Sequence, residues 1–241
     1  MNNSLNVKQM GIGEILCFHL LPGIPILVIV ILLSNPACGA GLPILLSVLL
    51  AIPLGLAPAQ LGVLYFAARK ENKKIKDIIP FTEKMSAVKT FLWVLPLLIF
   101  AALVYSSAAP FERPLWTIFD WAPQWFRLDK FSPEGLSKEV LILIAVLNIT
   151  LNGLLAPFVE ELYFRGFLLP RMNILGKMAP LCNTALFSLY HFITPWEFFT
   201  RILAITPYTY AVWYKKSLRL GILHPILNTL NGIVTAIIIL R

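Results

Sequence analysis

Long apolar runs restrict what this sequence can fold into more than any other feature. Because lipid offers no hydrogen-bond partners, a chain crosses a bilayer as helices of about 20 apolar residues whose backbone groups bond internally. Seven segments fit or approach this description, at approximately 14–34, 42–67, 90–109, 139–165, 179–196, 202–214 and 220–240. The sixth is shorter than an ordinary span, so we expect about seven spans, within limits of six and eight. The predicted fold class is therefore an all-α, polytopic transmembrane helix bundle.

Composition and charge also indicate a membrane protein. Of the 241 residues, 58% are hydrophobic and 13% are charged, which is more apolar surface than a soluble core of this length can bury. The formal net charge of +8 would suggest nucleic acid binding in a soluble protein. Here the basic residues gather in short loops between the apolar runs, so we expect the lipid bilayer, and no nucleic acid, as a partner.

The loop charges predict an orientation. Basic residues gather in three loops: seven between residues 69 and 89, then Arg171 and Lys177, then Lys215, Lys216 and Arg219. The positive-inside rule places these loops in the cytoplasm. Seven alternating spans then put the N-terminus inside and the aromatic-rich loop 110–138 outside, in the headgroup region. The expected location is the plasma (inner) membrane of a bacterial host or the endoplasmic reticulum of a eukaryotic one.

Two adjacent carboxylates near the end of the fourth segment are the first candidates for chemistry. An ionisable side chain at the centre of a spanning helix costs about 2.5–3.5 kcal/mol on insertion scales, so Glu160 and Glu161 need an explanation. Successive helical residues are turned by about 100°, so the two face different points, and Glu161 shares a face with Arg165. Glu160 has no local partner, which makes it the candidate general base or acid. A solvated position for both among the headgroups is the alternative.

Histidines and an asparagine in the late segments supply two further groups. Phe187 and His191 lie one turn apart on one helix face. Pro225 suits the first turn of a helix and places His224 at its start, with Asn228 on the same face. Each group also has a structural interpretation, because a membrane histidine often packs with a hydrogen bond and amides often join helices.

The depths of these residues set a requirement on the helices. His191 lies about 12 residues, or ~18 Å, into its segment, whereas Glu160 and His224 lie nearer the ends that carry the basic loops. If the three meet, we expect tilted, broken or differently bounded helices. The remaining histidine, His19, stands alone in the first apolar run and is predicted to be structural.

Three short motifs therefore follow one another on successive predicted spans. They are EExxxR (Glu160, Glu161, Arg165), FxxxH (Phe187, His191) and HxxxN (His224, Asn228). Together they resemble the motifs of the CAAX-protease/bacteriocin-processing (CPBP) family, which includes the type II CAAX prenyl endopeptidases. With no internal repeat, we expect one membrane domain, 1–241, in which 139–241 is the CPBP-like catalytic core.

This resemblance implies an intramembrane endopeptidase with a cytoplasm-facing cavity. Its substrate would be a membrane-associated protein or peptide, of the lipid-anchored CAAX type or bacteriocin-like. Carried over by motif, Glu160 and His191 activate a water molecule, and His224 and Asn228 stabilise the oxyanion. Glu161, Arg165 and Phe187 would support the site. This glutamate-type mechanism needs no cofactor and is the one we favour.

A zinc mechanism is the alternative chemistry. Glu160, His191 and His224 would form a His2Glu ligand set with an open position for water. No HExxH motif is present to fix such a site on one helix.

Two functions from other classes use the same residues. A non-catalytic membrane protein of the same fold, acting in bacteriocin immunity or scaffolding, would retain the bundle without hydrolysis. A small transporter would use the buried Glu, His and Asn as an ion path, although no inverted repeat supports this.

Overall fold

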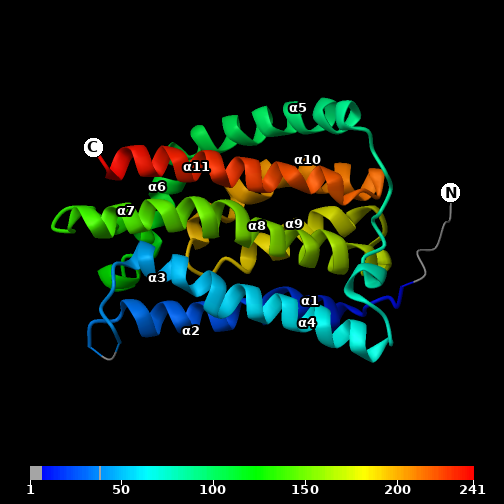
Figure 1. Ribbon diagram of the computed structural model, residues 1–241, viewed down its shortest axis with the longest axis horizontal. Coiled ribbons are helices and arrows are strands. Elements are labelled where there is room, and N and C mark those ends of the chain that lie inside the picture. The colour runs from blue at the N-terminus through cyan, green and yellow to red at the C-terminus, as the bar shows by residue number, and fades with distance from the viewer. Residues whose placement is uncertain (1–6, 38) are drawn as a thin grey trace.

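Helices account for the regular structure of this protein, and they lie roughly along one common axis (Figure 1). The computed structural model describes residues 7–37 and 39–241. In these residues no strand forms, an isolated bridge between Thr82 and Ser217 aside. The predicted all-α polytopic fold class is confirmed.

Five helical stretches in the described part of the chain are long and apolar enough to cross a membrane. They are Ile12–Ser34, Ile44–Lys70, Ala87–Ser106, Lys138–Arg171 and Leu218–Ile239. These coincide with the first four predicted segments and the seventh, and the chain is a multi-pass integral membrane protein. The fifth and sixth predicted segments contain α9 (Ala179–Leu189) and α10 (Phe198–Lys215). α9 is about 16 Å long, too short to cross a bilayer alone.

Most spans combine more than one kind of helix. The first joins α1 (Ile12–Leu20) to α2 (Gly23–Ser34), and the third is α5 (Ala87–Ser106) alone. The second joins α3 (Ile44–Ala51), the π-helix η1 (Ile52–Leu56) and α4 (Ala57–Lys70). The last joins the 3-10 helix η10 (Leu218–Ile222) to α11 (Leu223–Ile239).

The fourth span, which holds the first motif, is the most irregular. It runs as α7 (Lys138–Leu147), the π-helix η5 (Asn148–Leu155), α8 (Ala156–Glu160), the π-helix η6 (Glu161–Leu168) and the 3-10 helix η7 (Leu169–Arg171). Pro157 has no N–H and its ring crowds the preceding turn, so the wider π-helical turn before it relieves a clash. Helical geometry continues to Arg171, and the prediction that this segment ends near residue 165 was wrong.

The turn after Arg171 brings two motif residues to a common depth. The span and α9 form a hairpin, connected by the 3-10 helix η8 (Asn173–Met178). Glu160 lies 11 residues before Arg171 and His191 lies 12 residues after Ala179. Each is therefore about 16–18 Å from the turn. The expectation of broken and differently bounded helices is confirmed.

The three basic loops lie together at one end of the bundle, on the right in Figure 1. Glu83 donates its backbone N–H to the carbonyl of Lys216 at 3.0 Å, and the Tyr210 hydroxyl donates to the carbonyl of Lys177 at 2.9 Å. The C-terminus lies at the opposite end. The grouping of the basic loops therefore agrees with the predicted alternation of spans.

The loop between α5 and α7 lies at that opposite end and contains α6 (Ala109–Ile118). Phe111 and Trp121 in this loop are 76% and 80% exposed. Such exposed aromatic side chains suit the predicted position in the headgroup region.

His19 ties three elements together. Its Nδ1 lies 2.7 Å from the carbonyl of Ile15, and its Nε2 lies 3.0 Å from the amide nitrogen of Asn183 on α9. The same amide donates to the carbonyl of Phe164 in η6 at 3.0 Å. His19 is fully buried, and the prediction that it is structural is confirmed.

Candidate active site

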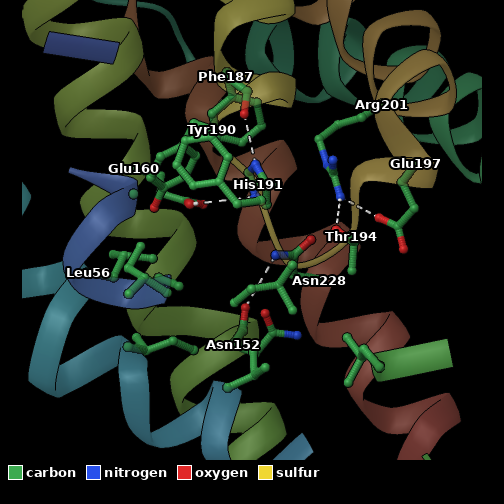
Figure 2. Close-up of a pocket in the computed structure, with 18 of the residues that line it drawn as sticks. Leu56, Asn152, Glu160, Phe187, Tyr190, His191, Thr194, Glu197, Arg201 and Asn228 are labelled. Carbon is green, nitrogen blue, oxygen red and sulfur yellow. Dashed lines mark hydrogen bonds and ion pairs between the residues drawn. The ribbon is translucent and has the colours of Figure 1, made fainter. Parts of the chain in front are cut away.

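Glu160 lies between two histidines. It is the last residue of α8 and is 3% exposed. Its Oε1 lies 3.9 Å from Nε2 of His191, and its Oε2 lies 3.9 Å from Nε2 of His224. The helices therefore bring together three residues that are far apart in the sequence, one from each motif. Figure 2 shows two of them, Glu160 and His191, facing each other.

His191 lies just beyond the C-terminal end of α9, and its ring is held by its own turn. Nδ1 lies 2.8 Å from the carbonyl of Phe187. A carbonyl only accepts hydrogen bonds, so Nδ1 carries the proton and the neutral ring presents its Nε2 lone pair to Glu160. His191 is therefore arranged to accept a proton on the side that faces the carboxylate.

Glu161 contacts different partners from those of Glu160. Its Oε1 lies 3.1 Å from Nδ1 of His224 and 3.6 Å from the Arg165 guanidinium, and its Oε2 accepts a hydrogen bond from the Tyr208 hydroxyl. The predicted ion pair between Glu161 and Arg165 is confirmed. This carboxylate also fixes the orientation of the His224 ring, because Nδ1 donates to Glu161 and Nε2 then points toward Glu160.

Phe187 fills the space between Arg165 and the two histidines. The guanidinium of Arg165, which is fully buried, lies 4.2 Å above the Phe187 ring and 5.7 Å from the Tyr208 ring. The Phe187 ring centre is 4.7 Å from that of His191 and 5.8 Å from that of His224. Aromatic faces attract a cation in a desolvated site, so Phe187 links Arg165 to both histidines.

Asn228 lies one turn beyond His224 on α11. Its amide donates to the backbone carbonyl of Asn152 in η5 at 3.3 Å (Figure 2). An amide nitrogen has two N–H groups, so one remains for another acceptor in the cavity that Asn228 lines.

A cavity of about 460 Å³ connects these side chains. Glu160, His191, His224 and Asn228 line it, whereas Glu161 and Arg165 stand behind it. Its lining also includes Glu112 of α6 and Leu128 of the following loop, which lie at the end opposite the basic loops. The cavity therefore extends from the motif residues toward the end of the bundle opposite the basic loops. Glu160 lies deeper from the basic loops than its predicted segment implied, because the helical span continues to Arg171.

Several residues of the site were not predicted from the sequence. They are Tyr208, Asn152, Glu197 and Arg201. Arg201 could have been identified from the sequence, because an arginine beside an apolar run needs a buried partner. It lies just outside the predicted segment 202–214. Nothing in a single sequence distinguishes Tyr208 from the other tyrosines.

The zinc alternative is less well matched by the geometry. The donor types suit zinc, and each imidazole has its Nδ1 held by another group, as zinc ligands do. In residues 7–37 and 39–241, however, no three His, Cys, Asp or Glu side chains are grouped so that they could hold a metal ion.

Comparison with known proteins gives one match. The family described as type II CAAX prenyl endopeptidase, Rce1-like, matches residues 142–230, which is less than half of the chain. No curated protein and no solved structure matches. The matched segment contains all three motifs. The resemblance that the motifs indicate is thereby confirmed: over residues 142–230 this membrane chain is similar to the Rce1-like type II CAAX prenyl endopeptidases, a family of proteases.

Proposed function

We propose that this protein is an intramembrane endopeptidase that hydrolyses a peptide bond with a water molecule activated by glutamate and histidine. The observation that carries the proposal is the position of Glu160, whose two oxygens each lie 3.9 Å from an imidazole Nε2 inside a cavity. This separation is too long for a direct hydrogen bond and short enough for one water molecule to bond to both groups.

The first step is attack by that water on the scissile carbonyl carbon. Glu160 and the Nε2 lone pair of His191 both face the water, and together they accept its proton as the new C–O bond forms. The carbonyl π electrons move to oxygen and give a tetrahedral oxyanion. No serine or cysteine nucleophile and no cofactor is required.

The oxyanion is stabilised by donors on α11. The free N–H of Asn228 is one, and removal of a single such donor costs about 2.7–4 kcal/mol in other hydrolases. His224 is the other, in its doubly protonated form, because Nδ1 donates to Glu161 and Nε2 must donate to the oxyanion. Glu161 therefore stabilises the positive charge on His224.

The second step breaks the C–N bond. The proton held by Glu160 or His191 passes to the leaving nitrogen, which departs as an amine, and the oxyanion collapses to a carboxylic acid. The site returns to its starting protonation state once the new carboxyl group loses its proton to water.

A second cavity favours a lipid-anchored substrate. It measures about 400 Å³, is lined almost entirely by apolar side chains, and shares Phe192 and Ile193 with the catalytic cavity. We propose that a hydrocarbon chain on the substrate, such as a prenyl group, occupies it. Ala122→Phe would fill part of this cavity. We expect a higher KM for a prenylated peptide and an unchanged KM for its unmodified counterpart.

We also propose that the end with the basic loops faces the cytoplasm, in the plasma membrane or the endoplasmic reticulum according to the host. The concentration of Lys and Arg in those loops supports this orientation. Reporter fusions after Lys216 and within the 107–137 loop test it, and the proposal requires a cytoplasmic signal from the first alone.

One experiment tests the proposed activity. Purified wild type, Glu160→Gln and His191→Ala are compared on a library of membrane peptides, with and without a chelator. We expect cleavage by wild type alone, unaffected by the chelator. Full activity of either variant contradicts the site assignment, and loss of activity with chelator points to zinc. Folded wild type that cleaves nothing favours a binding, immunity or transport function.

A further inference from the structure

His191 lies on a turn, outside any regular helix. α9 ends at Leu189, and the next helical residue is Pro195, where the 3-10 helix η9 (Pro195–Glu197) begins. Turn bonds hold the backbone of His191 in place of a continuous helical ladder: its N–H donates to the carbonyl of Ser188 at 3.3 Å, and its carbonyl accepts from the N–H of Thr194 at 3.1 Å. The distance between His191 and Glu160 depends on what holds this turn in place.

Arg201 bonds to the turn on both sides of His191. Its guanidinium donates to the Thr194 hydroxyl at 2.8 Å and to the Glu197 carboxylate, and it reaches the carbonyl of Ser188 at 3.5 Å. Ser188 precedes His191 and the other two follow it, so one side chain spans the turn. Figure 2 shows the bonds to Thr194 and Glu197. The Ser188 hydroxyl also donates to the carbonyl of Phe198 at 2.9 Å.

The chemistry of arginine suits this arrangement. Arg201 lies in the first turn of α10, is 5% exposed and forms an i,i+4 ion pair with Glu197. A planar guanidinium with five N–H donors can bond several acceptors at fixed angles, whereas the single ammonium of lysine cannot. The ion pair compensates the charge, and the remaining donors are available for Thr194 and Ser188.

We propose that Arg201 is a positioning residue for His191, holding the turn 190–197 so that the imidazole faces Glu160. This inference rests on the proposed role of His191 in proteolysis. Arg201 also lines the catalytic cavity, so direct binding of a substrate carboxylate is the competing explanation. The two differ in kinetics, because a positioning residue acts on kcat and a substrate-binding residue acts on KM.

The kinetic experiment compares Arg201→Lys with wild type in the full chain, on a peptide that wild type cleaves. We expect kcat per folded molecule to fall by about tenfold or more, with KM changed by less than about twofold. Thr194→Val should lower kcat less, and it should add little to Arg201→Lys, because both remove the same contact. A raised KM with kcat unchanged, or no change in either, overturns the proposal.

Arg171→Lys is the matched control. Arg171 is also a buried arginine, 2% exposed, and donates to the carbonyl of Phe167, but it does not line the cavity. We expect its kcat per folded molecule to stay at the wild-type value. If the control loses as much kcat as Arg201→Lys, the effect is one of general stability and the proposal fails.

A second measurement does not depend on activity. The chain has three histidines, so labelling histidine with ¹⁵N gives a ring spectrum that single His substitutions can assign. We expect one sharp set of His191 signals in wild type and Arg171→Lys, and broadened or doubled signals in Arg201→Lys. Unchanged His191 signals in Arg201→Lys contradict the inference. Full cleavage by Glu160→Gln instead contradicts the proposed function, so the two failures are distinguishable.

Discussion

Glu160 and Glu161 are adjacent in the chain but have different partners, because successive residues of a helix point in different directions. Glu160 faces two Nε2 atoms across the cavity, while Glu161 faces Nδ1 of His224, the Arg165 guanidinium and the Tyr208 hydroxyl. The same substitution should therefore have different effects at the two positions. In the proposed mechanism, Glu160→Gln removes the base, whereas a change around Glu161 weakens the stabilisation of a charged His224.

Tyr208→Phe tests the second role. It removes one donor to Glu161 without changing the shape of the side chain, and a hydrogen bond to a charged group contributes about 1.5–3 kcal/mol. A free-energy loss of about 1.4 kcal/mol in the transition state corresponds to about a tenfold fall in kcat, which we expect with KM unchanged.

Tyr163→Phe is the control for that measurement. Tyr163 is also buried, and its hydroxyl donates to the carbonyl of Phe18 rather than to a motif residue. It should lower thermal stability without lowering kcat per folded molecule. Equal kcat in wild type and Tyr208→Phe would show that this hydroxyl has no part in catalysis.

At the scale of elements, the π-helix η5 determines where Asn228 lies. The carbonyls of Asn152 and Gly153 in η5 accept hydrogen bonds from the Asn228 amide and the Thr229 hydroxyl of α11, at 3.3 Å and 3.2 Å. The two helices approach closely because residue 153 has no side chain. A Cβ there would lie 3.0 Å from Oγ1 and 3.2 Å from Cα of Thr229.

Gly153→Ala should therefore push α11 away and move Asn228. We expect kcat to fall several-fold and stability to fall by about 1–3 kcal/mol, as for other overpacked cores. Gly62→Ala on α4 is the control, because a Cβ at Gly62 meets nothing within 4 Å. Alanine is also the better helix former, so this control should be neutral or slightly stabilising. Wild-type kcat in Gly153→Ala would contradict the role of this helix contact.

The loop that follows α6 contains a buried ion pair between Arg127 and Asp129. Hydrogen bonds from Arg127, at 2.6–2.8 Å, hold the pKa of Asp129 below its usual range. A carboxylate whose pKa is lowered on folding stabilises the protein fully above its unfolded pKa of about 4, and this stability is lost as pH falls through the lower folded pKa. The protection of residues 124–131 against hydrogen exchange, relative to the intrinsic rate at each pH, should therefore fall in that acidic window. Asp129→Asn should show low protection at every pH, and equal protection in the variant and wild type at neutral pH would contradict this.

At the scale of the whole molecule, hydrophobic runs predicted the bundle and loop charges predicted which loops lie together. The contacts inside the site were harder to predict from the sequence. The end of the fourth span was misplaced because π- and 3-10 turns continue the helix past Gly166 to Arg171. Asn152 contributes a backbone carbonyl, which no side-chain pattern reveals, and the partner of Tyr208 is set by packing between distant segments. The motif residues were predictable because their types and spacing are unusual in lipid.

The matched segment does not complete the cavity by itself. Gly23, Ile26, Ile52 and Leu56 from the first two spans line one wall, and Gln60 donates to the Tyr190 hydroxyl at 3.0 Å. We therefore expect the fragment 139–241 alone to aggregate or to be inactive, and co-expression with 1–138 to restore cleavage. A monodisperse, active fragment would show that residues 139–241 form an independent domain.

Phe192 and Ile193, which separate the catalytic cavity from the apolar one, follow His191 directly in the chain. If a lipid tail occupies the apolar cavity, the position of this boundary fixes the distance between the lipid and the catalytic residues. An extended peptide advances about 3.3 Å per residue, so the bond presented to Glu160 must lie only a few residues from the lipid-bearing one. The cleaved bond would then be selected by its distance from the lipid-bearing residue, and the enzyme would need to recognise little of the surrounding peptide sequence.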